Sequence, residues 1–105
     1  MIRKEKKKVK EEAKELRKNT LKNVEFTFLA PEAMEVLLAG AFNSWDTHTL
    51  PMKKNKEGFW KISVNLAPGC YEYKFLADGV WVENISDVET APNPFGTRNF
   101  VTWVK

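Results

Sequence analysis

Four tryptophans are the residues of this sequence whose chemistry is most specific. Trp45, Trp60, Trp81 and Trp103 occur within 105 residues, and aromatic residues make up 12% of the chain. A tryptophan side chain offers a large flat apolar face and one hydrogen-bond donor. The interior of so small a domain has limited room for four such rings. We therefore expect at least one or two of them to lie at the surface and to take part in recognition.

Side chains suited to catalysis are sparse by comparison. The sequence has no Gly-x-Ser-x-Gly motif, no phosphate-binding glycine loop and no histidine cluster. Glycoside hydrolysis needs only two suitably spaced carboxylates, and a domain of this size offers little depth in which to bury one of them. The carboxylates present lie in or beside expected turns, where such residues commonly serve local hydrogen bonding: Asp46, Asp78, Glu83, Asp87 and Glu89. We expect no enzymatic activity and no catalytic residue.

Metal and cofactor chemistry is equally restricted. A single cysteine, Cys70, cannot form an internal disulfide or a cysteine-based metal site, and a single histidine, His48, cannot form a histidine cluster. We therefore expect neither a metal nor a cofactor.

Length and composition indicate one small globular domain. The chain has 43% hydrophobic and 30% charged residues, which is typical of folded proteins. No apolar run approaches the ~20 residues of a membrane-spanning helix. The charged start is not followed by the apolar segment of a secretory signal, so we expect a cytoplasmic protein.

Charge divides the chain near residue 23. Residues 1–23 carry ten basic and four acidic side chains, and residues 24–105 carry seven and ten, which gives net charges of +6 and −3. Residues 4–18 are rich in Lys, Glu, Ala and Leu without Gly or Pro, and predict a helix. A basic helix can bind nucleic acid or an acidic membrane, but interspersed glutamates and the lack of interleaved aromatic residues favour a solvated helix. We expect a charged N-terminal helix over residues 1–23, one folded domain over residues 24–105, and no nucleic-acid or membrane partner.

The hydrophobic period changes to two from Val24 onward. Alternation and turn residues predict about six short strands, over residues 24–29, 34–39, 59–65, 70–76, 80–83 and 99–104. Asp78-Gly79 is a hairpin dipeptide, because both turn positions need a positive φ. Short strands with frequent turns and no internal helix predict an all-β fold, an immunoglobulin-like β-sandwich.

Three motifs together resemble a known family. They are Gly40-Ala41-Phe42-Asn43-Ser44-Trp45, the run from Tyr71 to Trp81, and Asn93-Pro94-Phe95-Gly96-Thr97-Arg98-Asn99. In this order and spacing they resemble carbohydrate-binding module family 48. That family includes the glycogen-binding domain of the AMP-activated protein kinase beta subunit and the early-set domains of isoamylases and glycogen branching enzymes. The resemblance covers roughly residues 24–105.

This resemblance implies an early-set, immunoglobulin-like sandwich that binds α-glucans such as glycogen, starch or maltodextrins. The two tryptophans of the motifs would stack against glucose rings, the lysine and the last asparagine would hydrogen-bond sugar hydroxyls, and the threonine and phenylalanine would complete the site. The family often has an aliphatic residue at position 95, and the phenylalanine here would either add a third stacking ring or narrow the site. A second departure is Asn84-Ile85, near where the family commonly has Asp-Pro. The implied carbohydrate-binding residues are Trp45, Lys74, Trp81, Phe95, Thr97 and Asn99.

The residue types suit such a ligand. A sugar ring has an apolar C–H face and a polar hydroxyl rim, which flat aromatic faces and a few fixed donors and acceptors match. Strand alternation places Lys74 opposite three aromatic residues, so we expect it to point outward, where a ligand can reach it. Trp45 is expected at the surface, whereas Trp81 could equally pack across strands. Trp60 and Trp103 alternate with aliphatic neighbours and are expected in the core.

Two roles are open at this point. The first is non-catalytic binding of an α-glucan polysaccharide or oligosaccharide. The second is a protein-interaction domain that docks on a glucan-metabolising enzyme, because early-set domains often pack against catalytic domains. The first is favoured, since every implied sugar-contact position except 95 keeps the residue of the family pattern.

Removing residues 1–20 is expected to leave both the fold and glucan binding essentially intact. The change of period between Leu21 and Val24 places every expected strand after the helix. The truncated chain should keep the dispersed NMR spectrum of a folded domain, and its loss would show that the N-terminal segment is part of the core.

Overall fold

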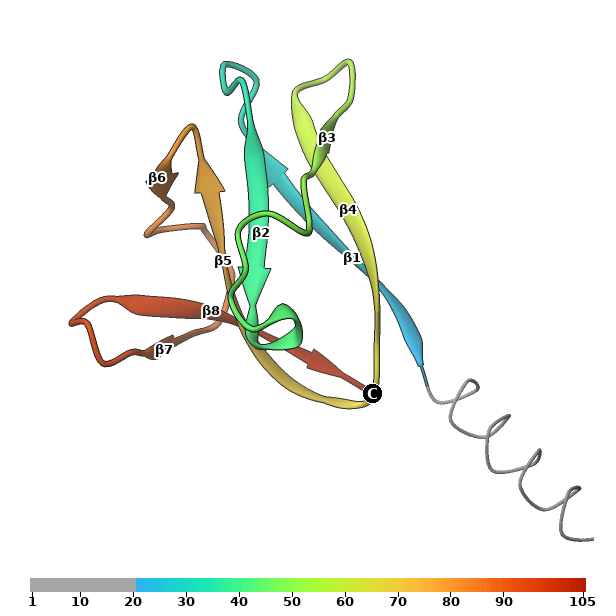
Figure 1. The fold of residues 1–105 in the computed structure, drawn as a ribbon, viewed down its shortest axis with the longest axis vertical. Helices are drawn as coiled ribbons and strands as arrows, with labels where there is room; N and C mark the ends of the chain where they lie inside the picture. Colours follow the sequence, from blue (N-terminus) through green and yellow to red (C-terminus); the bar gives the residue numbers. More distant parts are fainter. Residues whose placement is uncertain (1–20) are drawn as a thin grey trace, which may run out of the picture.

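Two antiparallel β-sheets pack against each other to form the domain (Figure 1). The computed structural model describes residues 21–105, so the expected N-terminal helix lies outside the described residues. The all-β sandwich predicted from the sequence is confirmed. Its first strand begins at Lys22, two residues before the expected boundary.

The smaller sheet has three strands in the order β1-β4-β3. Their bounds are Lys22–Leu29 for β1, Phe59–Leu66 for β4 and Lys53–Lys54 for β3. In the larger sheet the order is β2-β5-β8-β7, and the short β6 also pairs with β5. The bounds are Val36–Gly40 for β2, Gly69–Ala77 for β5, Val80–Trp81 for β6, Thr90–Pro92 for β7 and Arg98–Val104 for β8.

Three short elements lie where the sequence predicted loops. They are β3, β7 and a 3₁₀-helix, Ala41–Asn43. The two strands form by pairing with the edges of β4 and β8, so their own residues carry no alternating pattern that would predict them. The 3₁₀-helix lies within the polar loop that follows β2.

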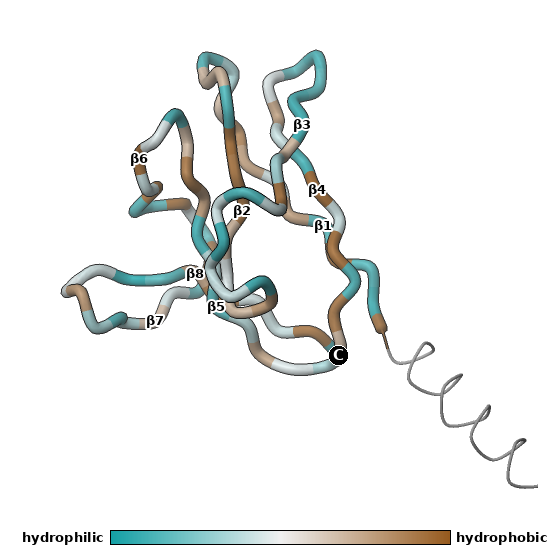
Figure 2. Tube along the Cα trace, in the orientation of Figure 1, coloured by the Kyte–Doolittle hydropathy of each residue, from teal (hydrophilic) through white to brown (hydrophobic). Residues whose placement is uncertain are grey.

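Aromatic contacts join the two sheets across the core. Phe28 of β1 stacks on Phe75 of β5 with ring centroids 5.0 Å apart, and Phe26 meets Tyr73 edge-on at 4.9 Å. Hydrophobic residues gather along β2, whereas hydrophobic and hydrophilic residues alternate along β4 (Figure 2). Burial raises the pKa of the Tyr73 hydroxyl above its ordinary value.

The two tryptophans expected in the core differ in position. Trp60 is buried, as predicted, and its indole Nε1 donates to the Ala30 carbonyl at 2.8 Å. Trp103 is 65% exposed, so the expectation for it is wrong. On β8 the core-facing residues are Phe100 and Val104, and strand alternation therefore turns Trp103 to the outer face. There its Nε1 donates to Glu89 Oε1 at 2.8 Å.

Trp60→Ala is expected to cost about 3–5 kcal/mol of unfolding free energy, because it empties a large buried site. Trp103→Ala is the matched control and is expected to cost about 1 kcal/mol or less, since it removes one exposed hydrogen bond. Urea denaturation of both variants measures the difference. An equal cost for the two would contradict this description of the core.

Candidate functional site

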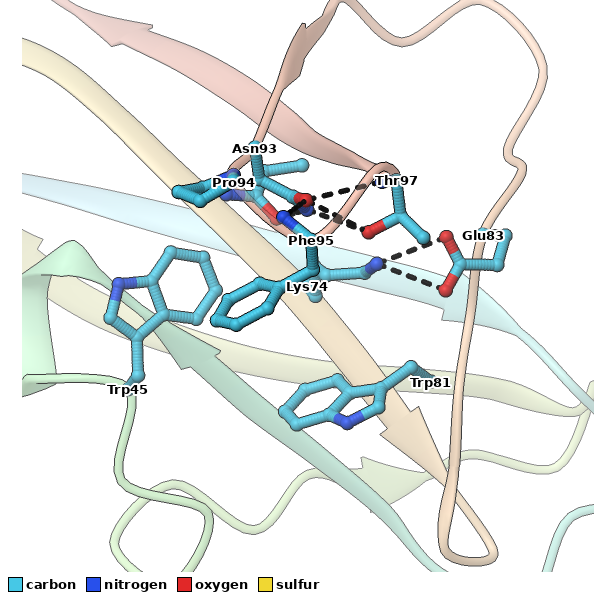
Figure 3. A pocket seen from close by; sticks show the side chains of 9 residues that line it. Trp45, Lys74, Trp81, Glu83, Asn93, Pro94, Phe95 and Thr97 are labelled. Carbon is cyan, nitrogen blue, oxygen red and sulfur yellow. Dashed lines mark hydrogen bonds and ion pairs between the residues drawn. The ribbon is translucent and has the colours of Figure 1, made fainter.

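A pocket opens on the outer face of the larger sheet, away from the smaller one. Its volume is about 670 Å³. All six residues implied by the sequence motifs line it, together with three others that were not predicted: Trp45, Lys74, Trp81, Glu83, Asn93, Pro94, Phe95, Thr97 and Asn99. Figure 3 shows that they come from several separate segments of the chain.

Trp45 is held by the loop that follows β2, and the organising residue of that loop is Asn43. The Asn43 side chain accepts from the Gly40 amide at 2.9 Å and donates to the Asp46 carbonyl at 2.9 Å and to Thr49 Oγ1 at 3.0 Å. Trp45 itself has a left-handed backbone (φ 60°), and its amide donates to the Gly40 carbonyl at 2.9 Å. These bonds fix the base of the indole side chain while leaving 38% of the residue exposed.

The start of this loop also needs a residue without a side chain. A Cβ atom on Gly40 would lie 2.7 Å from the Glu72 carbonyl oxygen and 2.7 Å from the Phe42 ring. The Phe42 ring packs against Phe26 with ring centroids 5.5 Å apart, so it anchors the loop to the core. Gly40 and Phe42 therefore let the loop lie close against β5.

Trp81 is positioned by the hairpin between β5 and β6. Asp78 and Gly79 have φ values of 49° and 79°, as the hairpin dipeptide predicted. The Asp78 carboxylate accepts from the amides of Met34 (2.9 and 3.2 Å) and Glu35 (2.8 Å), which ties the turn to the segment before β2. Trp81 lies opposite Leu76 on the outer face and is 40% exposed, so its ring is available to a ligand.

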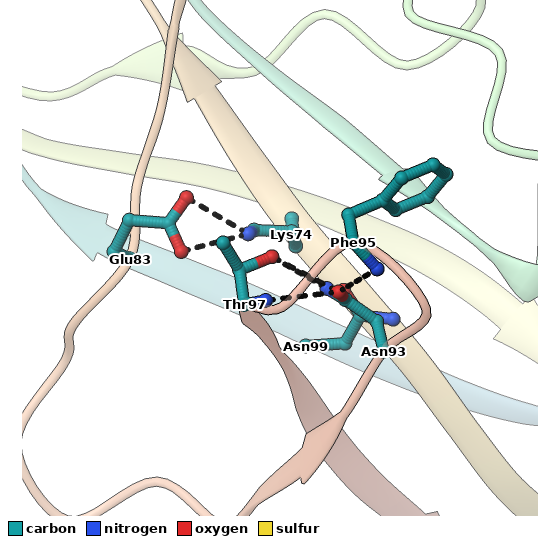
Figure 4. Close-up of polar contacts among 6 residues, drawn as sticks. All are labelled: Lys74, Glu83, Asn93, Phe95, Thr97 and Asn99. Carbon is teal, nitrogen blue, oxygen red and sulfur yellow. Dashed lines mark hydrogen bonds and ion pairs between the residues drawn. The ribbon is translucent and has the colours of Figure 1, made fainter.

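Phe95 and Thr97 lie in the loop between β7 and β8, which is organised by Asn93. The Asn93 Oδ1 atom accepts from the amides of Phe95 (3.0 Å) and Thr97 (3.2 Å), and Nδ2 donates to Thr97 Oγ1 at 2.7 Å (Figure 4). Gly96 has a φ of 81°, a conformation that glycine adopts without strain. Phe95 is 88% exposed. In the view of Figure 3 its ring lies between those of Trp45 and Trp81.

Lys74 departs from the expectation that it is exposed. It does lie on the face of β5 opposite Tyr73 and Phe75, but only 6% of it is exposed. A lysine is buried in this way when its charge has a partner. Here both oxygens of Glu83, in the segment after β6, lie 3.0 Å from the ammonium nitrogen.

Asn99 forms the buried polar floor of the pocket. Its Nδ2 donates to Glu72 Oε1 at 3.1 Å, and its Oδ1 accepts from Asn93 Nδ2 at 3.0 Å. Each of these amide atoms keeps the capacity for one more hydrogen bond. Asn99 can therefore donate to and accept from a ligand without losing the contacts that orient it.

The three unpredicted lining residues differ in the sequence signal that could have predicted them. Asn93 and Pro94 form an Asn-Pro dipeptide, which is a turn signal and marks the loop. Glu83 is one of several carboxylates that the sequence places in or beside expected turns. Its partner is set by the path of the chain after β6, for which the sequence carries no local signal.

Metal and membrane features are not found in the described part of the chain. Within residues 21–105 no group of three or more His, Cys, Asp or Glu residues is placed to hold a metal ion. In the same residues there is no helix with the length and hydrophobicity needed to cross a membrane.

Comparisons with known proteins identify the family to which this sequence belongs. A sequence model of carbohydrate-binding module 48, described as the isoamylase N-terminal domain, matches residues 12–92. The chain is 49% identical over 49 residues to Protein PTST homolog 2, chloroplastic, of Arabidopsis thaliana, which covers 47% of this chain and 9% of that protein. It is 34% identical over 82 residues to the phosphoglucan phosphatase DSP4, amyloplastic, of Castanea sativa, covering 76% of this chain and 22% of the relative.

A third relative is the human 5'-AMP-activated protein kinase subunit beta-2, which is 37% identical over 71 residues and covers 68% of this chain. The matched part is 25% of that subunit, so the chain corresponds to a small portion of each of these three relatives. The family model covers most of the chain, including the loop of Trp45 and the strand of Lys74. The chain therefore belongs to carbohydrate-binding module family 48, a family of carbohydrate-binding domains.

Proposed function

We propose that the pocket binds α-glucans, such as glycogen, starch or maltodextrin chains, without cleaving them. The observation that carries this proposal is the convergence of Trp45, Trp81 and Phe95. They come from three separate segments and present exposed rings to one pocket with a polar floor.

Stacking against sugar rings is the part of the proposal that rests on the aromatic side chains. The apolar C–H face of a glucose ring fits against a flat indole, as an aromatic face fits other apolar groups. The bonds around Asn43, Asp78 and Asn93 hold the three loops in place before a ligand arrives. Little ordering entropy is then lost on binding.

Polar recognition is assigned to the groups beneath and beside the rings. The Lys74 ammonium has three N–H groups, and the Glu83 carboxylate takes two contacts, so one donor is left for a sugar hydroxyl. The exposed Thr97 hydroxyl and the Asn99 amide add donors and acceptors. A few fixed polar groups on a mainly apolar pocket are typical of small-ligand sites.

The class of carbohydrate is suggested by a relative. The Castanea sativa protein is named a phosphoglucan phosphatase, and its match covers 76% of this chain. A glucan is therefore the carbohydrate that this comparison favours. The proposed partner is an α-glucan polysaccharide or oligosaccharide.

The carboxylates of the pocket are the reason for proposing that the chain does not cleave its ligand. Hydrolysis of a glycosidic bond needs a pair of carboxyl groups that flank it. Among the described residues that line the pocket, Glu83 is the one carboxylate, and Lys74 is paired with it. Neither a second acid nor a free base stands opposite.

Docking on a glucan-metabolising enzyme is the second candidate. It is favoured by two exposed apolar side chains beside the Asp78 turn, Met34 (86% exposed) and Val80 (68% exposed). This surface is separate from the residues that line the pocket. The two roles therefore make different predictions for the pocket tryptophans.

Trp45→Ala and Trp81→Ala are each expected to weaken maltoheptaose binding about tenfold, which corresponds to roughly 1.4 kcal/mol of lost stacking. The fold should survive, because both rings are partly exposed. Trp103→Ala is the control and should leave the affinity unchanged. Calorimetric titration at low and high salt measures these affinities, and an uncharged ligand should show little salt dependence.

Unchanged affinity in both pocket variants would contradict the proposed site and leave docking as the better explanation. Steep salt dependence would contradict recognition of the uncharged sugar by stacking and hydroxyl contacts.

The purified chain is expected to release no reducing sugar from amylose or glycogen, because the pocket lacks a second carboxylate. A reducing-end assay over long incubation measures this. Sustained release that Glu83→Gln abolishes would show that the chain is an enzyme.

A further inference from the structure

The ion pair in the pocket is unequally exposed. The Lys74 side chain is 8% exposed, whereas that of Glu83 is 45% exposed. Both Glu83 oxygens lie 3.0 Å from the Lys74 nitrogen. The carboxylate is therefore the more accessible of the two charges of this pair, whose contacts are drawn in Figure 4.

No other positive charge lines the described pocket to offset the exposed Glu83 carboxylate. Lys74 and Glu83 are the charged residues among those that line it. A second carboxylate, that of Glu72, accepts from the Asn99 amide at 3.1 Å and so lies directly behind the floor. Arg98 does not line the pocket, and its guanidinium donates to Thr90 Oγ1 at 2.8 Å and to the Thr90 carbonyl at 3.3 Å. The described lining of the pocket therefore carries one positive and one negative charge, with a second carboxylate behind its floor.

We propose that Glu83 makes the pocket selective for uncharged glucose rings and against rings that carry a phosphate or another anionic group. This inference rests on the proposed function, since it concerns the ligand of the same pocket. A sugar hydroxyl can donate to the Glu83 carboxylate, and such charge-assisted bonds are strong. An ionised phosphate offers mainly acceptors, and Glu83 repels it.

The lysine does not reverse this preference. Anionic groups are bound by Arg or Lys side chains whose donors are free to surround them. Two of the three Lys74 donors are directed at Glu83, and the rest of its side chain is covered. The single remaining donor suits one hydroxyl oxygen better than a tetrahedral anion.

Three forms of β-cyclodextrin test the proposal on the full chain. They are the parent compound, the form methylated at every primary hydroxyl and the form sulfated at every primary hydroxyl. The methyl groups add bulk without charge, and sulfation of every ring leaves no neutral ring to occupy the pocket. Each compound is used to displace fluorescent maltoheptaose, so that a sulfated ligand held only by the basic residues 1–23 is not counted.

The methylated compound should displace maltoheptaose nearly as well as the parent, and the sulfated one at concentrations about tenfold higher or more. The gap between the two compounds is the ratio of the concentrations at which the sulfated and the methylated compound displace maltoheptaose. In Glu83→Gln this gap should shrink by about fivefold or more, because the charge is lost and the shape is kept. Glu57→Gln changes the net charge equally in the turn before β4, on the other sheet, and should leave the gap unchanged.

Each other outcome has a definite meaning. Failure of the parent compound to displace maltoheptaose, or of maltoheptaose to bind, would overturn the proposed function itself. Equal displacement by methylated and sulfated compounds would overturn the selectivity while leaving glucan binding intact, whether both are strong or both are weak. A gap that persists in Glu83→Gln would show that this residue is not its cause.

A second variant covers the case in which Glu83→Gln fails to fold because Lys74 loses its charged partner. The double substitution Lys74→Met/Glu83→Met leaves neither charge unpaired, and such replacements are often tolerated. The gap should close there as well, and an unchanged gap would contradict the proposal.

Discussion

Strand β5 is the element on which both the core and the pocket depend, because its alternate side chains point to opposite faces of the larger sheet. Tyr73 and Phe75 enter the core and meet the aromatic residues of β1. Lys74, between them, lies beneath the pocket. The same strand pairs with β2, β6 and β8, which lead into or out of every segment that supplies a pocket ring. A shift of one residue in its register would exchange core and pocket residues.

The pocket also requires ordered loops, because its exposed aromatic rings are not held in position by packing in the core. Each ring-bearing segment contains one polar side chain that bonds to backbone amides nearby: Asn43, Asp78 and Asn93. The bonds of Asn43 and Asn93 lie within their own loops and replace missing strand partners there, whereas Asp78 bonds to amides 43 and 44 residues away in the sequence. The chain belongs to a carbohydrate-binding family, and rigid loops that present flat rings suit a ligand with apolar ring faces.

Much of this arrangement could be predicted from the sequence, because period and turn chemistry are local. Alternation predicted the outward direction of Lys74, and Asp78-Gly79 predicted the hairpin that carries Trp81. Alternation alone does not say which face of β8 meets the core, and so Trp103 was misplaced. The burial of Lys74 depends on Glu83, nine residues later, whose position is set by tertiary structure.

The four indole N–H signals in a ¹H–¹⁵N NMR spectrum test the central claim most directly, because each tryptophan occupies a different environment. During titration with maltoheptaose, the Trp45 and Trp81 signals should move together with one dissociation constant. The buried Trp60 signal and the Trp103 signal, which belongs to a ring on the outer face of β8 and bonded to Glu89, should stay in place. Movement of the Trp103 signal while those of Trp45 and Trp81 remain fixed would contradict the account and place the glucan elsewhere on the domain.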